Sequence, residues 1–335
     1  MQLSSGPASA VRFSVEAPEG KARRKYLSLQ YLRGLAAALV VLQHTDRSDM
    51  SSPFGDNEFA KCGVHVFFVI SGFIMYTAAK NERVVEFVWK RIVRIAPLYW
   101  LVTALWLTSN QLRGAPITRS GLHVVLSLLF VPHYSPEFPT KLWPCLVPGW
   151  TLNLELFFYA VFGLGLAMRR PLLIPLVTIL TLAVFGRVIR SDAPLWLAYT
   201  DPVVLEFAAG LLIAWLIDQD DARYSVYTAL CLGGLFAASW LLGWAMPVQV
   251  GIFSATLLTA SICLERSGYV PELRVLHVLG DASYSIYLWH VFAISGVTAV
   301  LHVVARPDFT ANAGPWLVML TALVGGYLIH VSVEQ

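Results

Sequence analysis

The chain has 335 residues, of which 57% are hydrophobic types and only 13% are charged. An ordinary soluble domain carries roughly 25% charged residues, and a mean hydropathy of +0.63 leaves too little polar surface for a water-soluble fold. The composition therefore predicts an integral membrane protein. The net charge of +3 is too small to suggest nucleic-acid binding. The four cysteines show no metal-ligand spacing, so we expect no metal site.

Residues 1–26 are polar and end in a basic cluster, Arg23, Arg24 and Lys25. Because no apolar core with a small-residue cleavage site precedes this cluster, we expect no cleaved signal peptide. A basic leader directly before the first apolar run places the N-terminus in the cytoplasm. We therefore predict a cytoplasmic leader over residues 1–26 and a single transmembrane domain over residues 27–335.

The apolar runs predict an all-α, polytopic helix bundle of about ten transmembrane helices. The expected spans are 27–44, 62–79, 95–109, 150–168, 171–189, 203–217, 225–243, 247–264, 282–302 and 315–333. Pro97, Pro171, Pro202 and Pro247 lie at span starts, where a missing N–H costs little. A further segment, 121–132, is apolar over only about 12 positions, whereas a crossing helix needs roughly 20, so we expect a re-entrant or interfacial piece. Both the ten-span and the eleven-span arrangement keep most Lys and Arg on the cytoplasmic side, so the charge distribution does not distinguish them. The short length of segment 121–132 favours ten spans.

Two ionisable residues lie in the first span. Arg33 and His44 are eleven positions apart, so they share one helix face and are separated by about 16 Å along the axis. Such residues are costly in a bilayer and are candidate functional residues. The alternative is structural: Arg33 extends to the lipid headgroups and His44 caps the helix.

Arg91 and Arg94 lie three residues apart where an apolar helix begins, so both guanidinium groups share a face and could bind phosphate oxygens. Other basic residues in this loop are explained as topology signals. Glu155 lies about one and a half turns inside the apolar run that begins near residue 150. A carboxylate there is either a functional group or one half of a structural ion pair with an arginine of a neighbouring helix.

Further polar residues are candidates to line a cavity. Glu206 lies beside small residues that suit close helix contact. Tyr284, Tyr287 and His290 recur every three residues on one helix face. These three either line an aqueous cavity or form hydrogen bonds across a helix interface.

Six segments occur in an order typical of one membrane-protein family. They are YLRGLAAALVVLQH (31–44), GVHVFFVISGFIMY (63–76), FVWKRIVRIAPLYW (87–100), GWTLNLELFFY (149–159), LEFAAG (205–210) and LGDASYSIYLWH (279–290). Together they resemble the acyltransferase 3 family, and within it they are most similar to bacterial exopolysaccharide acetyltransferases.

The resemblance implies one acyltransferase domain over residues 27–335 in the bacterial inner membrane. Its expected reaction moves an acyl group, usually acetyl, from cytoplasmic acyl-CoA to a sugar hydroxyl of an exopolysaccharide or another cell-envelope glycan. The expected partners are acyl-CoA, a glycan or lipid-linked oligosaccharide, and the bilayer. Acetyl-CoA or another acyl-CoA is expected as donor substrate, with no tightly bound cofactor.

The resemblance also implies roles for individual residues. His44 matches the family's essential histidine, and Arg33 the arginine of the same motif. Arg91 and Arg94 match its RxxR pair, and Glu155 the acid of its WTL…E…FY motif. Trp150 opens that last motif and is a candidate cavity-lining residue. At position 65 the family commonly has an acidic residue, whereas this chain has a histidine, which puts in doubt any ion pair or proton relay there.

These matches suggest a mechanism. The CoA phosphates bind Arg33, Arg91 and Arg94, His44 deprotonates the sugar hydroxyl as general base, and Glu155 orients His44 or stabilises its imidazolium. A transporter or glycan flippase is the first alternative, because intramembrane Arg, His and Glu also serve substrate pathways. Against this alternative, the sequence shows no inverted repeat of the kind that is typical of transporters. A non-enzymatic subunit of a glycan export complex is the second alternative.

Overall fold

The computed structural model describes residues 26–45, 61–114, 120–219, 222–304 and 307–334, and within these ranges the regular secondary structure is entirely helical. The predicted cytoplasmic leader, residues 1–26, lies outside the described residues except for its last position. The principal helices are Leu27–His44 (α1), Cys62–Ala79 (α2), Val84–Leu112 (α3), Gly121–Leu128 (α4), Gly149–Ala167 (α5), Leu173–Val188 (α6), Pro194–Tyr199 (α7), Leu205–Ile217 (α8), Ala222–Leu241 (α9), Met246–Arg266 (α10), Arg274–Asp281 (α11), Ser283–Val304 (α12) and Pro307–Ile329 (α13).

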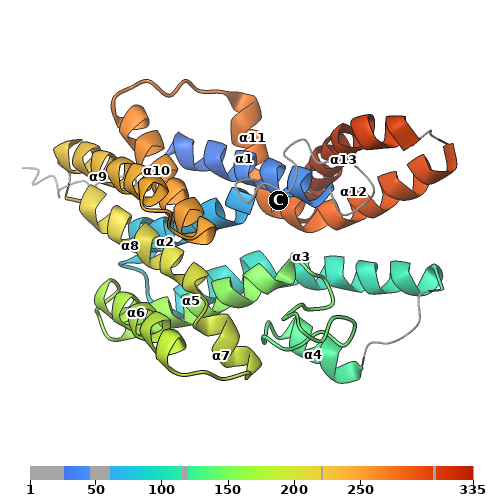
Figure 1. The fold of residues 1–335 in the computed structure, drawn as a ribbon, viewed down its shortest axis with the longest axis horizontal. Coiled ribbons are helices and arrows are strands. Elements are labelled where there is room, and N and C mark those ends of the chain that lie inside the picture. The colour runs from blue at the N-terminus through green and yellow to red at the C-terminus, as the bar shows by residue number, and fades with distance from the viewer. Residues whose placement is uncertain (1–25, 46–60, 115–119, 220–221, 305–306, 335) are drawn as a thin grey trace, which may run out of the picture.

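Each of the ten expected spans coincides with one helix, so the predicted polytopic bundle is confirmed. Within the described ranges, six segments are long and apolar enough to cross a membrane: α2, α3, α5, α10, α12 and Thr310–Glu334. Three shorter apolar helices correspond to α6, α8 and α9. The remaining expected span is α1, which contacts α2, α10, α11, α12 and α13 in the middle of the bundle. Figure 1 shows α12 and α13 side by side at one end of the molecule and α9 and α10 at the other.

The third span starts earlier than the sequence predicts. α3 begins at Val84 and not near residue 95, so Pro97 lies inside the helix, where its missing N–H removes one hydrogen bond. The additional turns are stabilised by Lys90, whose ammonium lies 2.7 Å from Glu86 and 3.2 Å from Glu82. The interpretation of Pro97 as a start signal is therefore wrong, because the helix already begins at Val84.

The ambiguous segment 121–132 forms only an eight-residue helix, α4. Eight residues rise about 12 Å, much less than the roughly 30 Å of a hydrocarbon core. The Ser120 side chain caps its start by accepting a hydrogen bond from the His123 amide at 3.2 Å. At its other end, the Trp100 indole of α3 donates to the Leu128 carbonyl at 2.9 Å. The segment therefore packs beside α3 as a short non-crossing piece.

The relative directions of α2 and α8 agree with ten spans. His65 pairs with Glu206 where both helices begin, and Lys80 pairs with Asp218 where both helices end. The two helices are therefore parallel. Between α2 and α8 the chain crosses the membrane three times, in α3, α5 and α6, so α2 and α8 run in the same direction. A fourth crossing by α4 would make α2 and α8 antiparallel. With ten spans, the start of α1 and the end of α10 lie on the same side of the membrane. The structure agrees, because Glu265 at the end of α10 accepts hydrogen bonds from the Leu27 and Ser28 amides at 2.8 and 2.9 Å.

Two glycines allow α2 and α8 to approach closely. A Cβ atom added to Gly72 would lie 2.1 Å from the Phe207 carbonyl oxygen, and one added to Gly210 would lie 2.0 Å from the Val69 carbonyl oxygen. Small residues at a helix crossing permit this backbone contact. The crossing fixes the parallel pair whose opposite ends carry the two ion pairs.

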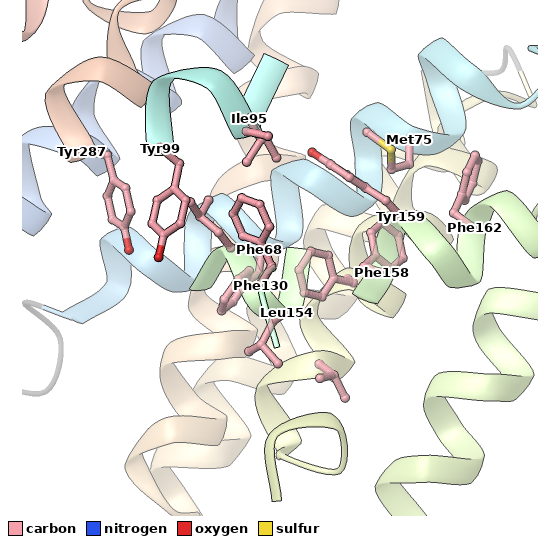
Figure 2. Close-up of a cluster of buried hydrophobic side chains, with 14 of the residues drawn as sticks. Phe68, Met75, Ile95, Tyr99, Phe130, Leu154, Phe158, Tyr159, Phe162 and Tyr287 are labelled. Carbon is pink, nitrogen blue, oxygen red and sulfur yellow. The ribbon is translucent and has the colours of Figure 1, made fainter. Parts of the chain in front are cut away.

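A cluster of buried aromatic and aliphatic side chains joins α2, α3, α5, α8 and α12 (Figure 2). The view places Tyr287 and Tyr99 at one end of this cluster and Phe162 at the other. Tyr99, Phe158 and Phe162 have at most 1% of their surface exposed. Close packing of this kind restrains side-chain positions, so the residues that border the cluster are held on a rigid frame.

Candidate active site

The structure contains a cavity of about 810 Å³, which we call the wide cavity. Its walls come from α1, α2, α5, α8, α9, α10 and α12 and from the segment before α5. Five residues that the sequence singles out line it: His44, Trp150, Glu206, Tyr287 and His290. A mostly apolar cavity of this size with a few convergent polar groups is the usual form of a small-molecule site.

His44 lies at the end of α1, where the side chain enters the wide cavity. Its Nδ1 atom lies 2.7 Å from the Val40 carbonyl oxygen one turn earlier. A carbonyl oxygen can only accept, so Nδ1 carries the proton and Nε2 of the neutral ring bears the lone pair. That tautomer is the one a general base needs.

His290 is the ring neighbour of His44. Their ring centroids lie 5.1 Å apart with planes at 60°. His290 is 1% exposed, and its Nδ1 atom is hydrogen-bonded to the Tyr287 carbonyl. Its position is therefore fixed by α12, so it is placed to limit the rotation of the His44 ring.

The Tyr287 hydroxyl connects α12 with the start of α5. It donates to the Pro148 carbonyl at 3.0 Å and lies 2.8 Å from the Thr151 hydroxyl. Tyr287 lines both the wide cavity and a second cavity of about 70 Å³, which we call the small pocket. Val64 lines both as well. The two spaces are therefore neighbours that share part of their walls.

Glu155 lines the small pocket together with Ser71 of α2. It accepts hydrogen bonds from the Tyr159 hydroxyl and, at 3.3 Å, from the Ser71 hydroxyl. It also attracts Arg33 electrostatically. Its hydrogen bonds are to hydroxyl groups, and only its electrostatic attraction to Arg33 points to the second interpretation, an interaction with an arginine of a neighbouring helix. The contacts described for His44 are instead to Val40 and His290.

The structure gathers Arg33, Arg91 and Arg94, which we call the arginine cluster. The Arg91 guanidinium lies 5.4 Å from the Phe87 ring centroid and 5.7 Å from that of Tyr159. Arg33 is near enough to Arg94 for mutual repulsion. Three guanidinium groups, two of which repel each other, form a site that an anion would stabilise.

Tyr284 both lines a cavity and forms a hydrogen bond across a helix interface, the two roles that the sequence leaves open. Its side chain lines the small pocket, and its hydroxyl donates across a helix interface to the Ile95 carbonyl of α3 at 2.7 Å. Since Ile95 directly follows Arg94, this hydrogen bond fixes the backbone next to the arginine cluster.

Two lining residues are missed by the sequence reasoning. His65 is interpreted there only as a departure from the family pattern, yet it lines the wide cavity and pairs with Glu206. An ionisable residue within the apolar run of α2 is the signal that could have found it. Trp143 lines the same cavity from the irregular segment before α5, where no local pattern marks it. Among the described residues, no three His, Cys, Asp or Glu side chains gather in a way that could hold a metal ion.

The fold is that of a multi-helix membrane protein with a mostly apolar cavity at the end of α1. The family described as an acyltransferase domain matches residues 26–333, nearly the whole described chain. The chain belongs to this family, in agreement with its six motifs. The exopolysaccharide production protein ExoZ of Rhizobium meliloti is 41% identical over 281 residues, which cover 81% of this chain and 86% of that protein. The acyltransferase MdmB of Streptomyces mycarofaciens is 28% identical over 359 aligned positions, covering 92% and 90% of the two chains. No solved structure matches the chain.

Proposed function

We propose that the protein is a membrane-bound O-acetyltransferase that moves an acetyl group from cytoplasmic acetyl-CoA to a sugar hydroxyl of an exopolysaccharide or another cell-envelope glycan. One observation carries the proposal: α1 bears His44 at the wide cavity and, about 16 Å away along its axis, Arg33 in the arginine cluster. The name of its relative ExoZ, an exopolysaccharide production protein, supports the choice of acceptor. The protein would lie in the inner membrane with its N-terminus in the cytoplasm.

The arginine cluster is the proposed binding site for the CoA phosphates. Arg91 is held by Phe87 and Tyr159, so its planar group is oriented before the donor arrives. Arg33 and Arg94 repel each other without an anion, and a phosphate between them would turn this repulsion into attraction. Glu155 attracts Arg33, so we assign it to positioning the arginine end.

His44 is the proposed general base. With Nδ1 on the Val40 carbonyl, its Nε2 atom accepts the proton of the sugar hydroxyl as the hydroxyl oxygen attacks the thioester carbonyl carbon. The bond from that carbon to sulfur breaks, the CoA thiolate leaves, and the proton held by His44 passes to the thiolate. The small pocket, which shares Tyr287 with the wide cavity, offers a route for the pantetheine arm between the two ends of α1.

The experiment uses the purified full chain in lipid vesicles with radiolabelled acetyl-CoA and alkali-de-O-acetylated exopolysaccharide of the producing strain. Covalent transfer of label to the polysaccharide supports the proposal. Movement of glycan across the bilayer without label transfer would support a flippase, and neither result would support a non-enzymatic role in export. The label should be released from the product by mild alkali, as expected for an O-ester.

A further inference from the structure

The wide cavity has a second polar wall, formed by a histidine and a carboxylate from two different helices. The His65 imidazole of α2 pairs with Glu206 of α8 through Nδ1 and Oε1. Both residues line the cavity that also contains His44. The close crossing at Gly72 and Gly210 fixes the two helices, so the pair has a defined position.

Glu206 has more hydrogen-bonding capacity than the described structure uses. The residue is 7% exposed, and its Oε2 atom is buried without a hydrogen-bond partner among the described residues. A buried carboxylate oxygen without a donor costs free energy. Asp201, which also lines the wide cavity, lies near enough to repel Glu206. This part of the wall is therefore rich in acceptors, and Glu206 Oε2 has no donor among the described residues.

The space in front of Glu206 is kept open by Gly251 of α10. A Cβ atom added to Gly251 would lie only 3.1 Å from Glu206 Oε1. The Trp150 indole lines the same cavity. A flat aromatic side chain beside carboxylate acceptors suits a ligand with apolar C–H faces and hydroxyl donors, which is the chemistry of a sugar ring. An acyl chain of a lipid offers no donor to Oε2.

We propose that the His65–Glu206 pair binds the acceptor sugar, with a sugar hydroxyl donating to the Glu206 carboxylate and His65 holding the carboxylate in place. This inference rests on the proposed function, because it assigns the acceptor subsite of that same cavity. The pair lies on α2 and α8, whereas His44 lies on α1. Acceptor binding and proton removal are thus carried by different helices, and the arginine cluster is not involved.

The test compares steady-state kinetics of the full chain with Glu206→Gln, using acetyl-CoA and the de-O-acetylated exopolysaccharide. The amide keeps the size but replaces the carboxylate acceptor. We expect the KM for the polysaccharide to rise about tenfold or more, with the KM for acetyl-CoA unchanged. Gly251→Ala narrows the same space without changing a charge, and it should raise the polysaccharide KM in the same direction. It therefore keeps the test valid if Glu206→Gln fails to fold.

Asp218→Asn is the matched control. It breaks the other ion pair between α2 and α8, that of Lys80 with Asp218 at the opposite end of both helices. A loosened helix pair would affect both variants, whereas a lost acceptor contact affects only Glu206→Gln. An unchanged polysaccharide KM in well-folded Glu206→Gln and Gly251→Ala would overturn the proposal. So would an equal rise in both KM values, or the same effect in Asp218→Asn.

A direct binding measurement separates this inference from the proposed function. If the wild-type chain transfers no acetyl group, the proposed function fails. Saturation-transfer NMR with oligosaccharides cut from the same polysaccharide still tests the subsite. Binding by the wild type that is lost in Glu206→Gln supports the inference, and equal binding by both, or binding by neither, contradicts it.

Discussion

The ring centroids of His44 in α1 and His290 in α12 lie 5.1 Å apart, with the ring planes at 60°. In both residues the Nδ1 atom is hydrogen-bonded to a main-chain carbonyl oxygen of the same helix. Each neutral ring therefore has its proton on Nδ1 and its lone pair on Nε2. The contact positions the proposed base, whose tautomer is set by helix geometry.

His290 should act as a positioning residue for His44. Replacement His290→Leu removes the ring contact while keeping an apolar side chain in the buried position. We expect kcat to fall about tenfold, the equivalent of roughly 1.4 kcal/mol, with both KM values unchanged. Initial rates with saturating acetyl-CoA measure the effect. An unchanged kcat in a well-folded variant would remove the positioning role.

The arginine cluster should determine donor affinity. Arg91→Ala and Arg94→Ala should each weaken acetyl-CoA binding by roughly 1.5–3 kcal/mol, because a charge-assisted contact is lost. Replacement by Lys should recover only part, since the forked guanidinium geometry is lost. Calorimetric titration checks both points. Lys90→Ala is the control on the same helix: Lys90 pairs with Glu82 and Glu86, and donor affinity should be kept. Equal affinity of the wild type and both alanine variants of the cluster would rule out this site.

The ten-span arrangement places Lys141, before α5, and Arg170, after α5, on opposite sides of the membrane. The test replaces the four native cysteines and introduces Lys141→Cys or Arg170→Cys, both at exposed positions. Arg170 is preferred to Arg169, whose φ of 54° a cysteine would find strained. An impermeant maleimide applied to intact spheroplasts should label position 141 and not position 170, whereas lysed cells should label both. Labelling of position 170 alone in intact spheroplasts would require an eleventh span.

The α2–α8 crossing should be intolerant of added volume. Gly72→Ala and Gly210→Ala place a methyl group within about 2 Å of a main-chain carbonyl oxygen, so the helices must separate. We expect a loss of about 1–3 kcal/mol of stability and a lower Tm in detergent. Gly234→Ala in α9 is the control, because nothing lies within 4 Å of its added Cβ, and its Tm should not fall. Wild-type Tm values for both crossing variants would contradict the packing described here.

The ten helices that coincide with the expected spans could be predicted because apolar run length is a local property of the sequence, whereas the short helices α7 and α11 could not. The short segment 121–132 is correctly distinguished from a span for the same reason, since its helix has only eight residues. The start of α3 could not be predicted from Pro97. The helix continues through a position where a proline usually marks a beginning, and the ion pairs of Lys90 with Glu82 and Glu86 lie in and just before its first turns.

The site is only partly readable from the sequence. The common face of Arg33 and His44 follows from helix periodicity alone. The Ser71 contact of Glu155 and the His65 contact of Glu206 do not, because these partners come from helices distant in the sequence. The structure gives Glu155 contacts with Ser71 and Tyr159, and it gives Glu206 a contact with His65. Which helices become neighbours depends on packing such as the glycine crossing, and no local spacing encodes that choice.

The most direct test of the account is the rate of acetyl transfer to de-O-acetylated exopolysaccharide by purified His44→Ala. Loss of a general base should lower kcat about 10²-fold or more, while acetyl-CoA affinity and Tm stay at wild-type values because the arginine cluster and the core are untouched. His302→Ala, at an exposed position in the last turn of α12, should keep wild-type activity. A well-folded His44→Ala variant that keeps most of the wild-type rate would contradict the assignment of His44 as the base.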